Sequence, residues 1–285
     1  MANEATTPAA QAPQKKKKSK APVILLIILL LIVALVVFIG VQRAKNVKAM
    51  REAIAAGKDA IAAHTTYSPR DPGGYRHIKL NALMQFDVEQ YQIDDLGNLS
   101  VMTVDMGVMQ MASFVLTPFE KNAPLLSVDY IYALTNRKAI VEFYDLVPDP
   151  SEESYAAIVA EMKTFADEYS ALADDPADEA WYDKYITVKL HKKAGSADDA
   201  TLKAMLADAV SVVMDGADTL DPLDADGHRM KVALTKAYSD GLITQGGVST
   251  DVFKSALGED TTRNFFDTVF FGTAYEQDED DAVEE

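Results

Sequence analysis

Residues 125–134, Leu-Leu-Ser-Val-Asp-Tyr-Ile-Tyr-Ala-Leu, are typical of a β-strand that is buried on both sides. Because side chains alternate along a strand, one face carries Leu126, Val128, Tyr130, Tyr132 and Leu134. The other face carries Ser127, Asp129, Ile131 and Ala133, which leave more room. We therefore expect helices on both sides of the sheet, with space for a ligand or a covering helix over the second face.

The surrounding sequence indicates further strands and then helices. Runs rich in Val, Ile, Phe, Tyr and Met occupy Leu83–Tyr91, Leu99–Met106, Val108–Thr117 and Ala139–Val147. After residue 150 the apolar period becomes helical in 155–169, in 202–213 and in two or three segments of 228–271, with one more strand in 181–191. This order predicts one α+β domain, residues 67–274, in which a mostly antiparallel sheet lies between helix layers.

The N-terminal region has the pattern of a membrane anchor. Residues 21–42 contain no charge, and at roughly 1.5 Å per residue such a helix crosses the ~30 Å hydrocarbon core. A signal-peptide core is usually only about 7–15 residues long, so we expect an uncleaved transmembrane helix. Residues 43–66 are expected to continue it as an amphipathic helical stalk. Residues 1–20 and 275–285 are expected to be disordered tails, the first basic and the second acidic.

The charge is divided sharply between the two parts of the chain. The net charge is -17, but residues 1–51 carry nine basic side chains and one acid, which leaves residues 52–285 at -25. Residues 52–285 are therefore acidic enough to repel phosphates, which argues against nucleic-acid binding. Lysines 15–18 are expected to lie at anionic lipid head groups. They are costly to translocate, which favours a cytoplasmic N-terminus and an extracytoplasmic domain, although basic residues on both flanks leave the side open.

Several kinds of chemistry lack support in the sequence. The chain has no cysteine, which excludes thiol nucleophiles, iron–sulfur clusters and zinc–cysteine sites. No metal site is predicted, because the four histidines lie far apart and form no H-x-x-x-H pair. Residues 224–227, Asp-Ala-Asp-Gly, resemble part of a calcium loop, but Pro222 and Ala233 fall at its terminal ligand positions. A turn between helices is the favoured interpretation.

Asp129 is the most unusual residue of the predicted sheet. A carboxylate buried without a cation has a raised pKa, which suits a general acid. The alternative, favoured from the residues alone, is an ion pair with Arg137, with Arg76 or with a cationic side chain of a helix. Glu142 and Asp145, on the next strand, face opposite sides and leave the same two readings open.

Two segments resemble the ferredoxin-dependent bilin reductases, the family of phycocyanobilin:ferredoxin oxidoreductase. The first contains Thr117-Pro118, the run Ala123–Tyr130 and the strand end Phe143–Leu146, and the second is Val252–Phe271. With the 181–190 strand they cover about 60 of the 285 residues. The resemblance implies an α/β/α sandwich, and it implies that Asp129 is the proton donor to a tetrapyrrole.

The resemblance is incomplete at two other positions. Ser113 stands near the place of the family's assisting histidine, and Gly247-Val248 near that of an Asp-Lys pair. Beside Asp129, we expect Ser113, Ser127 and Ile131 to contact the ligand. The family's electron donor, ferredoxin, is acidic, so residues 52–285, with a net charge of -25, would repel it.

Two hypotheses follow. The first is a membrane-anchored bilin-reductase-like protein that binds a linear tetrapyrrole or similar planar ligand and reduces it with Asp129 as proton donor. No flavin or nicotinamide motif is visible, so no bound cofactor is predicted and electrons would come from a partner protein. The second is a non-catalytic anchored module of the same fold, for ligand binding or protein interaction.

Overall fold

The computed structural model describes residues 21–247 and 250–276, and its centre is one antiparallel sheet. The strand order is β1-β3-β4-β5-β6-β7-β9-β8, with β2 also paired to β3. Five of the predicted strands are confirmed to within about three residues, and the strand predicted in 181–191 lies at 186–195; the short β1, β2 and β8 were not predicted. The strands are β1 Tyr67–Arg70, β2 His77–Lys79, β3 Gln85–Ile93, β4 Gly97–Asp105, β5 Met109–Pro118, β6 Leu125–Ala133, β7 Asn136–Tyr144, β8 Ala173–Asp174 and β9 Ile186–Gly195.

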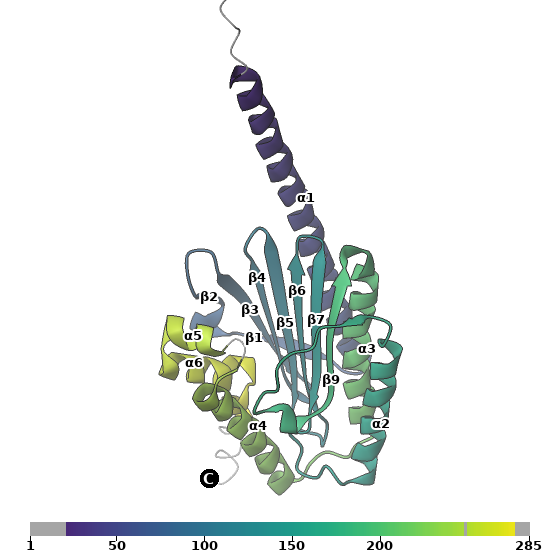
Figure 1. Ribbon diagram of the computed structural model, residues 1–285. Coiled ribbons are helices and arrows are strands. Elements are labelled where there is room, and N and C mark those ends of the chain that lie inside the picture. The colour runs from purple at the N-terminus through teal and green to yellow at the C-terminus, as the bar shows by residue number, and fades with distance from the viewer. Residues whose placement is uncertain (1–20, 248–249, 277–285) are drawn as a thin grey trace, which may run out of the picture. The chain divides into compact units, whose positions relative to one another are not determined.

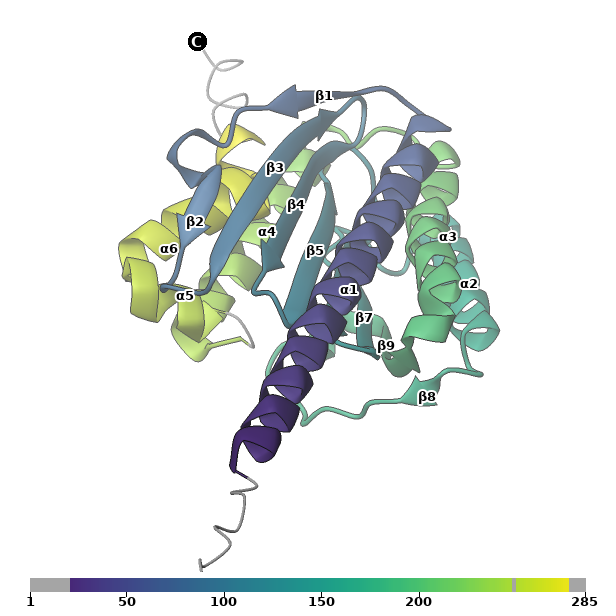
Figure 2. The same ribbon diagram turned by 90° about the horizontal axis from the view of Figure 1, so that it is seen from above.

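Helices cover both faces of this sheet, which confirms the predicted α+β sandwich (Figures 1 and 2). Residues 39–62 of α1, together with α2 and α3, lie on one face, and α4, α5, α6 and the π-helical turn η4 lie on the other. The helices are α1 Ala21–Ala62, α2 Glu153–Glu168, α3 Asp199–Asp218, α4 Ala225–Gln245, α5 Thr250–Leu257, α6 Glu259–Phe265 and η4 Phe266–Phe270.

Helix α1 has two parts of different character. From Ile24 it is long and apolar enough, by length and composition, to cross a membrane, and none of its most apolar stretch is buried. This exposure differs from that of a core helix. Further along, Met50, Ala53 and Ile61 are buried in the core of the sheet domain. The tail predicted for residues 1–20 and all but the start of the one predicted for 275–285 lie outside the described residues; Tyr275 and Glu276 are helical, and Glu276 is buried.

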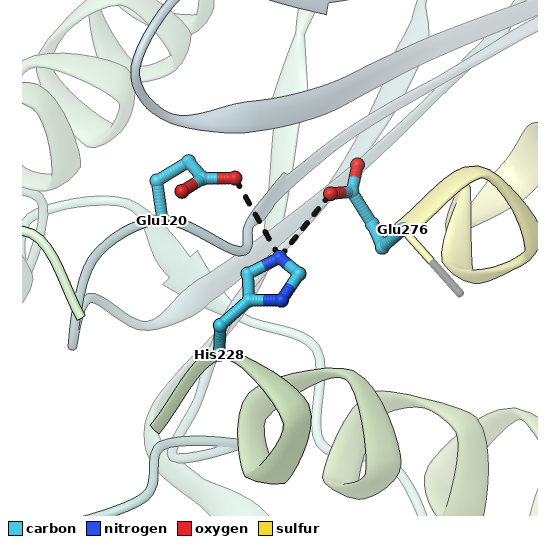
Figure 3. Close-up of side chains that lie close together, drawn as sticks. All are labelled: Glu120, His228 and Glu276. Carbon is cyan, nitrogen blue, oxygen red and sulfur yellow. Dashed lines mark hydrogen bonds and ion pairs between the residues drawn. The ribbon is translucent and has the colours of Figure 1, made fainter. Parts of the chain in front are cut away.

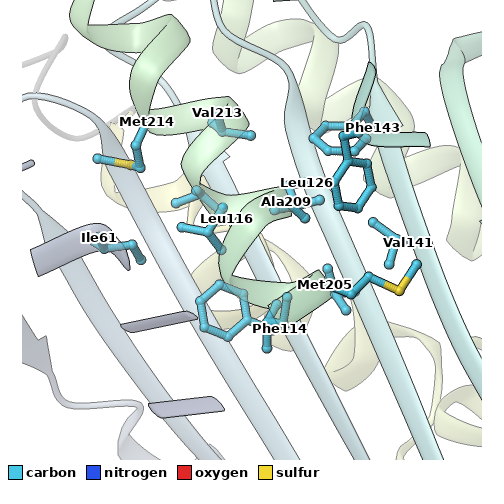
Figure 4. Close-up of a cluster of buried hydrophobic side chains, with 14 of the residues drawn as sticks. Ile61, Phe114, Leu116, Leu126, Val141, Phe143, Met205, Ala209, Val213 and Met214 are labelled. Atoms are coloured by element: carbon cyan, nitrogen blue, oxygen red, sulfur yellow. The ribbon is translucent and has the colours of Figure 1, made fainter. Parts of the chain in front are cut away.

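The larger core lies between the sheet and helices α1, α2 and α3 (Figure 4). Every second residue of β6 points into it, and Met205, Ala209 and Val213 of α3 present one helical stripe to the strands. The hydroxyl of Tyr130 also donates to the backbone oxygen of Leu202 at 2.8 Å, which satisfies a buried phenol. This packing fixes which face of β6 is left for other contacts.

On the opposite face, polar side chains hold η4 against the sheet. Gln90, Asn98 and Ser100 donate to the backbone oxygens of residues 268, 269 and 270 at 2.9, 3.2 and 2.8 Å. The last carbonyls of a helix lack partners within it, so these side chains satisfy groups that burial would otherwise leave unpaired. The position of η4 over the sheet is therefore set by hydrogen bonds as well as by apolar contact.

Helix α4 approaches Trp181 closely at Gly241. A Cβ atom at Gly241 would collide with the indole ring, and Trp181 Nε1 donates to the Gly246 oxygen at 2.6 Å. The indole ring is thus held by its packing against Gly241 and by its hydrogen bond to Gly246. Only glycine at this position lets helix and indole come this close.

We expect Gly241→Ala to destabilise the protein by about 1–3 kcal/mol, because the added methyl group must displace the indole or the helix. Trp181 is the single tryptophan, so its fluorescence reports both the displacement and urea unfolding. Gly74→Ala is the matched control, since a Cβ there meets nothing within 4 Å. Equal unfolding midpoints for the two variants would contradict the close approach.

Candidate functional site

A cavity lies between the free face of β6 and the helices of the second layer. Its empty volume is about 1060 Å³, which includes open solvent at its mouth. The sheet contributes the polar side chains of Ser113, Ser127, Asp129, Glu142 and His191. Opposite them lie mostly apolar and aromatic side chains, among them Tyr182, Tyr238, Leu242, Phe253, Phe266, Phe270 and Phe271.

Four of the lining residues form one cross-strand row. Ser113 of β5 pairs with Asp129 of β6, Asp129 pairs with Ile140 of β7, and Ile140 pairs with His191 of β9. Directly paired residues project from the same face of a sheet, about 4.5–5.5 Å apart. The register of three strand pairs therefore brings a hydroxyl, a carboxyl and an imidazole into one cavity.

All four site residues expected from the sequence lie on this cavity. Asp129, Ser113, Ser127 and Ile131 line it together, as strand alternation predicted for the three on β6. Gly247, near the expected place of the Asp-Lys pair, lines it as well, whereas Val248 lies outside the described residues. Their placement is settled, and their roles stay predictions.

The Asp129 carboxyl accepts a hydrogen bond from the Ser113 hydroxyl. Burial raises the pKa of Asp129 to about 6, the charge of Glu142 acts in the same direction, and the Ser113 bond and His191 oppose it. A carboxyl with that pKa holds its proton in mildly acidic solution, which is the property of a general acid.

The expected ion pair of Asp129 with an arginine is wrong. Arg137 projects from the other face of the sheet, where its Nε donates to Asp199 at 2.6 Å. Arg76 lies at the surface and pairs with Asp71 at 2.9 Å. Of the two readings of Asp129, the carboxyl without an arginine partner is the one that the structure contains.

Glu142 and His191 form a second polar group in the same cavity. His191 Nε2 lies 2.7 Å from Glu142 Oε1, and the Tyr144 hydroxyl donates to Glu142 Oε2 at 2.5 Å. Burial raises the pKa of Tyr144 well above its usual value, so the phenol stays a donor. The second carboxylate of the cavity is therefore partnered by an imidazole and a phenol.

His191 is a lining residue that was not predicted. Its strand was expected in 181–191, but no local metal motif contains this histidine. The signal was the strand's alternation, which sends Val188 and Leu190 to the large core and His191 to the opposite face. Glu142, left undecided there, faces the cavity, whereas Asp145 accepts hydrogen bonds from Tyr155 and Thr187.

The structure is thus an α/β/α sandwich in which an antiparallel sheet lies between two helix layers and a cavity separates polar side chains of the sheet from aromatic side chains of the second layer. The crystal structure of phytochromobilin synthase from tomato in complex with biliverdin is similar, with a TM-score of 0.63 and 15% sequence identity. The likeness covers 78% of this chain and 83% of that one. No family model and no curated protein matches the chain. The distant resemblance to the bilin reductases is thus confirmed at the level of the fold.

The raised pKa of Asp129 predicts a pH-dependent stability. Below about pH 4 the carboxyl is protonated in both the folded and the unfolded chain. Between about pH 4 and 6 only the unfolded chain loses the proton, so stability falls as pH rises and the loss persists above pH 6. The Asp129→Asn variant has no carboxyl at this position, so its unfolding free energy does not fall for this reason as the pH rises.

From pH 4 to pH 7 we therefore expect the unfolding free energy of Asp129→Asn to rise relative to the native protein by on the order of 1–2 kcal/mol. Urea denaturation at stepped pH measures it. Asp59→Asn, at an exposed position of α1, is the control and should follow the native profile. A parallel profile for Asp129→Asn would contradict the raised pKa.

Proposed function

We propose that this chain is a membrane-anchored, bilin-reductase-like protein that binds a linear tetrapyrrole or similar planar ligand in its cavity and reduces it with Asp129 as the proton donor. One observation carries the proposal: a carboxyl with a raised pKa lies in the cavity of a fold whose solved relative is complexed with biliverdin.

The cavity suits a flat, largely apolar ligand with polar nitrogen and oxygen atoms. Pockets for small molecules usually enclose about 300–1,000 Å³, are lined mainly by apolar side chains and carry a few placed polar groups. Here the aromatic residues Phe253, Phe266 and Phe270 lie opposite the polar row, so a planar ligand would have rings on one side and Asp129 on the other. Aromatic faces stack favourably on such a ligand.

Reduction of one double bond consumes two electrons and two protons, and the cavity contains groups for both protons. The protonated Asp129 carboxyl gives the first, to the ligand atom nearest it. His191, held by Glu142, is the proposed source of the second. It provides an imidazole in the cavity although Ser113 stands at the position where the resemblance placed a histidine.

The electrons are proposed to come from a partner protein. Several lysines on and beside β9 are already paired with aspartates: Lys138 and Lys193 with Asp175, and Lys189 with Asp183. The net charge of -25 for residues 52–285 already includes these lysines, so the domain as a whole remains strongly acidic. The donor should therefore present a neutral or basic docking face, unlike an acidic ferredoxin.

A specific observation favours the second candidate, a non-catalytic module. Ser113 donates a hydrogen bond to Asp129, and such a bond favours the ionised form of the carboxyl. A cavity of this shape in which Asp129 is less often protonated would bind a ligand without reducing it. Ligand binding and reduction must therefore be measured separately.

For the purified full chain in detergent, we expect biliverdin to show a shifted absorption band that saturates with protein. With a chemical reductant and a low-potential electron mediator, the band should then change as the bilin is reduced. Asp129→Asn should bind with similar affinity and lose reduction by about 10²–10⁴-fold, the range that general acids contribute.

Asp59→Asn is the matched control, because it removes an exposed carboxylate outside the cavity. Absence of a band shift with biliverdin and with haem would remove the basis of both candidates as tetrapyrrole proteins. A shift without reduction in the native chain would leave the binding module, and equal reduction by Asp129→Asn would exclude Asp129 as the donor.

The membrane anchor is also part of the proposal. The exposed apolar part of α1 supports insertion in a bilayer, and the lysines before it support a cytoplasmic N-terminus with the sheet domain outside. Protease added to intact cells should then digest the sheet domain. A domain that is cut only after the cells are lysed would show the opposite orientation, and recovery of the domain in the soluble fraction would refute the anchor.

A further inference from the structure

Three potential metal ligands from distant parts of the chain meet outside the cavity (Figure 3). Glu120 follows β5, His228 lies in the first turn of α4, and Glu276 lies near the C-terminus. One ligand atom from each lies within 4.8 Å of the other two. No metal site was predicted, because metal motifs have short spacings, whereas 108 and 48 residues separate these three.

The backbone holds at least two of these side chains firmly. The Glu120 N–H donates to the Leu96 oxygen at 3.1 Å, and the Glu120 oxygen accepts from the Leu223 N–H at 2.9 Å. His228 lies on a helix whose N-terminus is capped by Asp224, which accepts from the Gly227 N–H at 2.8 Å. The turn that resembled a calcium loop is thus a helix cap, and it sets the direction of His228.

The distances fit a shared ion. His228 Nε2 lies 3.5 Å from Glu120 Oε1 and 3.3 Å from Glu276 Oε2. The contact with Glu276 is a long hydrogen bond, and one nitrogen carries at most one proton, so Nε2 can donate to only one of the two carboxylates. Ligands of a tetrahedral zinc ion lie about 3.3–3.4 Å from each other, because each lies about 2.0–2.1 Å from the metal.

The three side chains differ in burial. The Glu276 side chain is only 4% exposed and that of His228 12%, whereas that of Glu120 is 39% exposed. Two of the three ligand groups therefore lie largely away from water, and the third faces it. One nitrogen and two oxygen ligands suit zinc and similar first-row ions better than calcium, which takes oxygen ligands only.

We propose that Glu120, His228 and Glu276 bind one divalent metal ion of the zinc class, with water at the remaining position. None of the three lines the cavity, so this site is separate from the proposed tetrapyrrole site. The ion joins the loop after β5, the start of α4 and the segment after η4, and its role is structural.

The test is titration of the purified, metal-stripped full chain with Zn²⁺ in a calorimeter, in buffer that contains excess Ca²⁺ to occupy purely acidic sites. We expect one Zn²⁺ per chain and a melting temperature raised by several degrees, because an ion that binds only the folded chain stabilises it. Co²⁺ in place of Zn²⁺ should give the visible absorption of a tetrahedral site with nitrogen and oxygen ligands.

His228→Ala and Glu120→Gln should each abolish the stoichiometric binding and the Co²⁺ spectrum. Glu120 is the most exposed of the three, so its variant keeps the test valid if His228→Ala fails to fold. His64→Ala is the matched control, because its ring also faces two carboxylates, Asp215 and Asp218, through its two different nitrogens. Absence of Zn²⁺ binding, or binding that His228→Ala and Glu120→Gln leave unchanged, would overturn the proposal.

Discussion

The site depends on one constraint, the alternation of side chains along a strand that is buried on both faces. Leu126, Val128 and Tyr130 of β6 are fixed in the large core, so the residues between them must face the cavity. A slip of one residue in the pairing would bring Asp129 into the apolar core and Val128 into the cavity. The apolar face of β6 therefore determines where the acid lies.

This constraint also explains what the sequence could reveal. The longer strands, the two helix layers and the face of Asp129 follow from period and composition alone, whereas the short β1, β2 and β8 do not. The pairing with Arg137 was wrong for the same reason: Arg137 has the parity of Ala139 and Val141, which point into the large core. Arg137 therefore lies on the face of the sheet opposite to Asp129, although the two residues are close together in the sequence.

Other features lay beyond the sequence because they depend on register between distant strands. Glu142 and His191 meet only because β7 and β9 pair with Ile140 opposite His191. Nothing local in either strand fixes that register. The cluster of Glu120, His228 and Glu276 needs even more, since a loop, a helix and the C-terminal segment must all be placed before the three side chains meet.

The two carboxyl groups of the cavity have different partners, and this difference suggests different roles. Glu142 has an imidazole and a phenol to stabilise its charge, whereas Asp129 has one hydroxyl. Two carboxylates in one low-dielectric site resist ionising together, so the proton stays where charge is least stabilised. That carboxyl is Asp129, whose pKa is raised to about 6 and whose acidity the Glu142 charge weakens further.

Helix α4 connects the cavity with the proposed metal site. Tyr238 and Leu242 line the cavity, and His228 lies ten residues before Tyr238, about 15 Å along the helix. A metal ion at His228 would therefore affect the cavity by fixing the position of α4, the element that the two sites share.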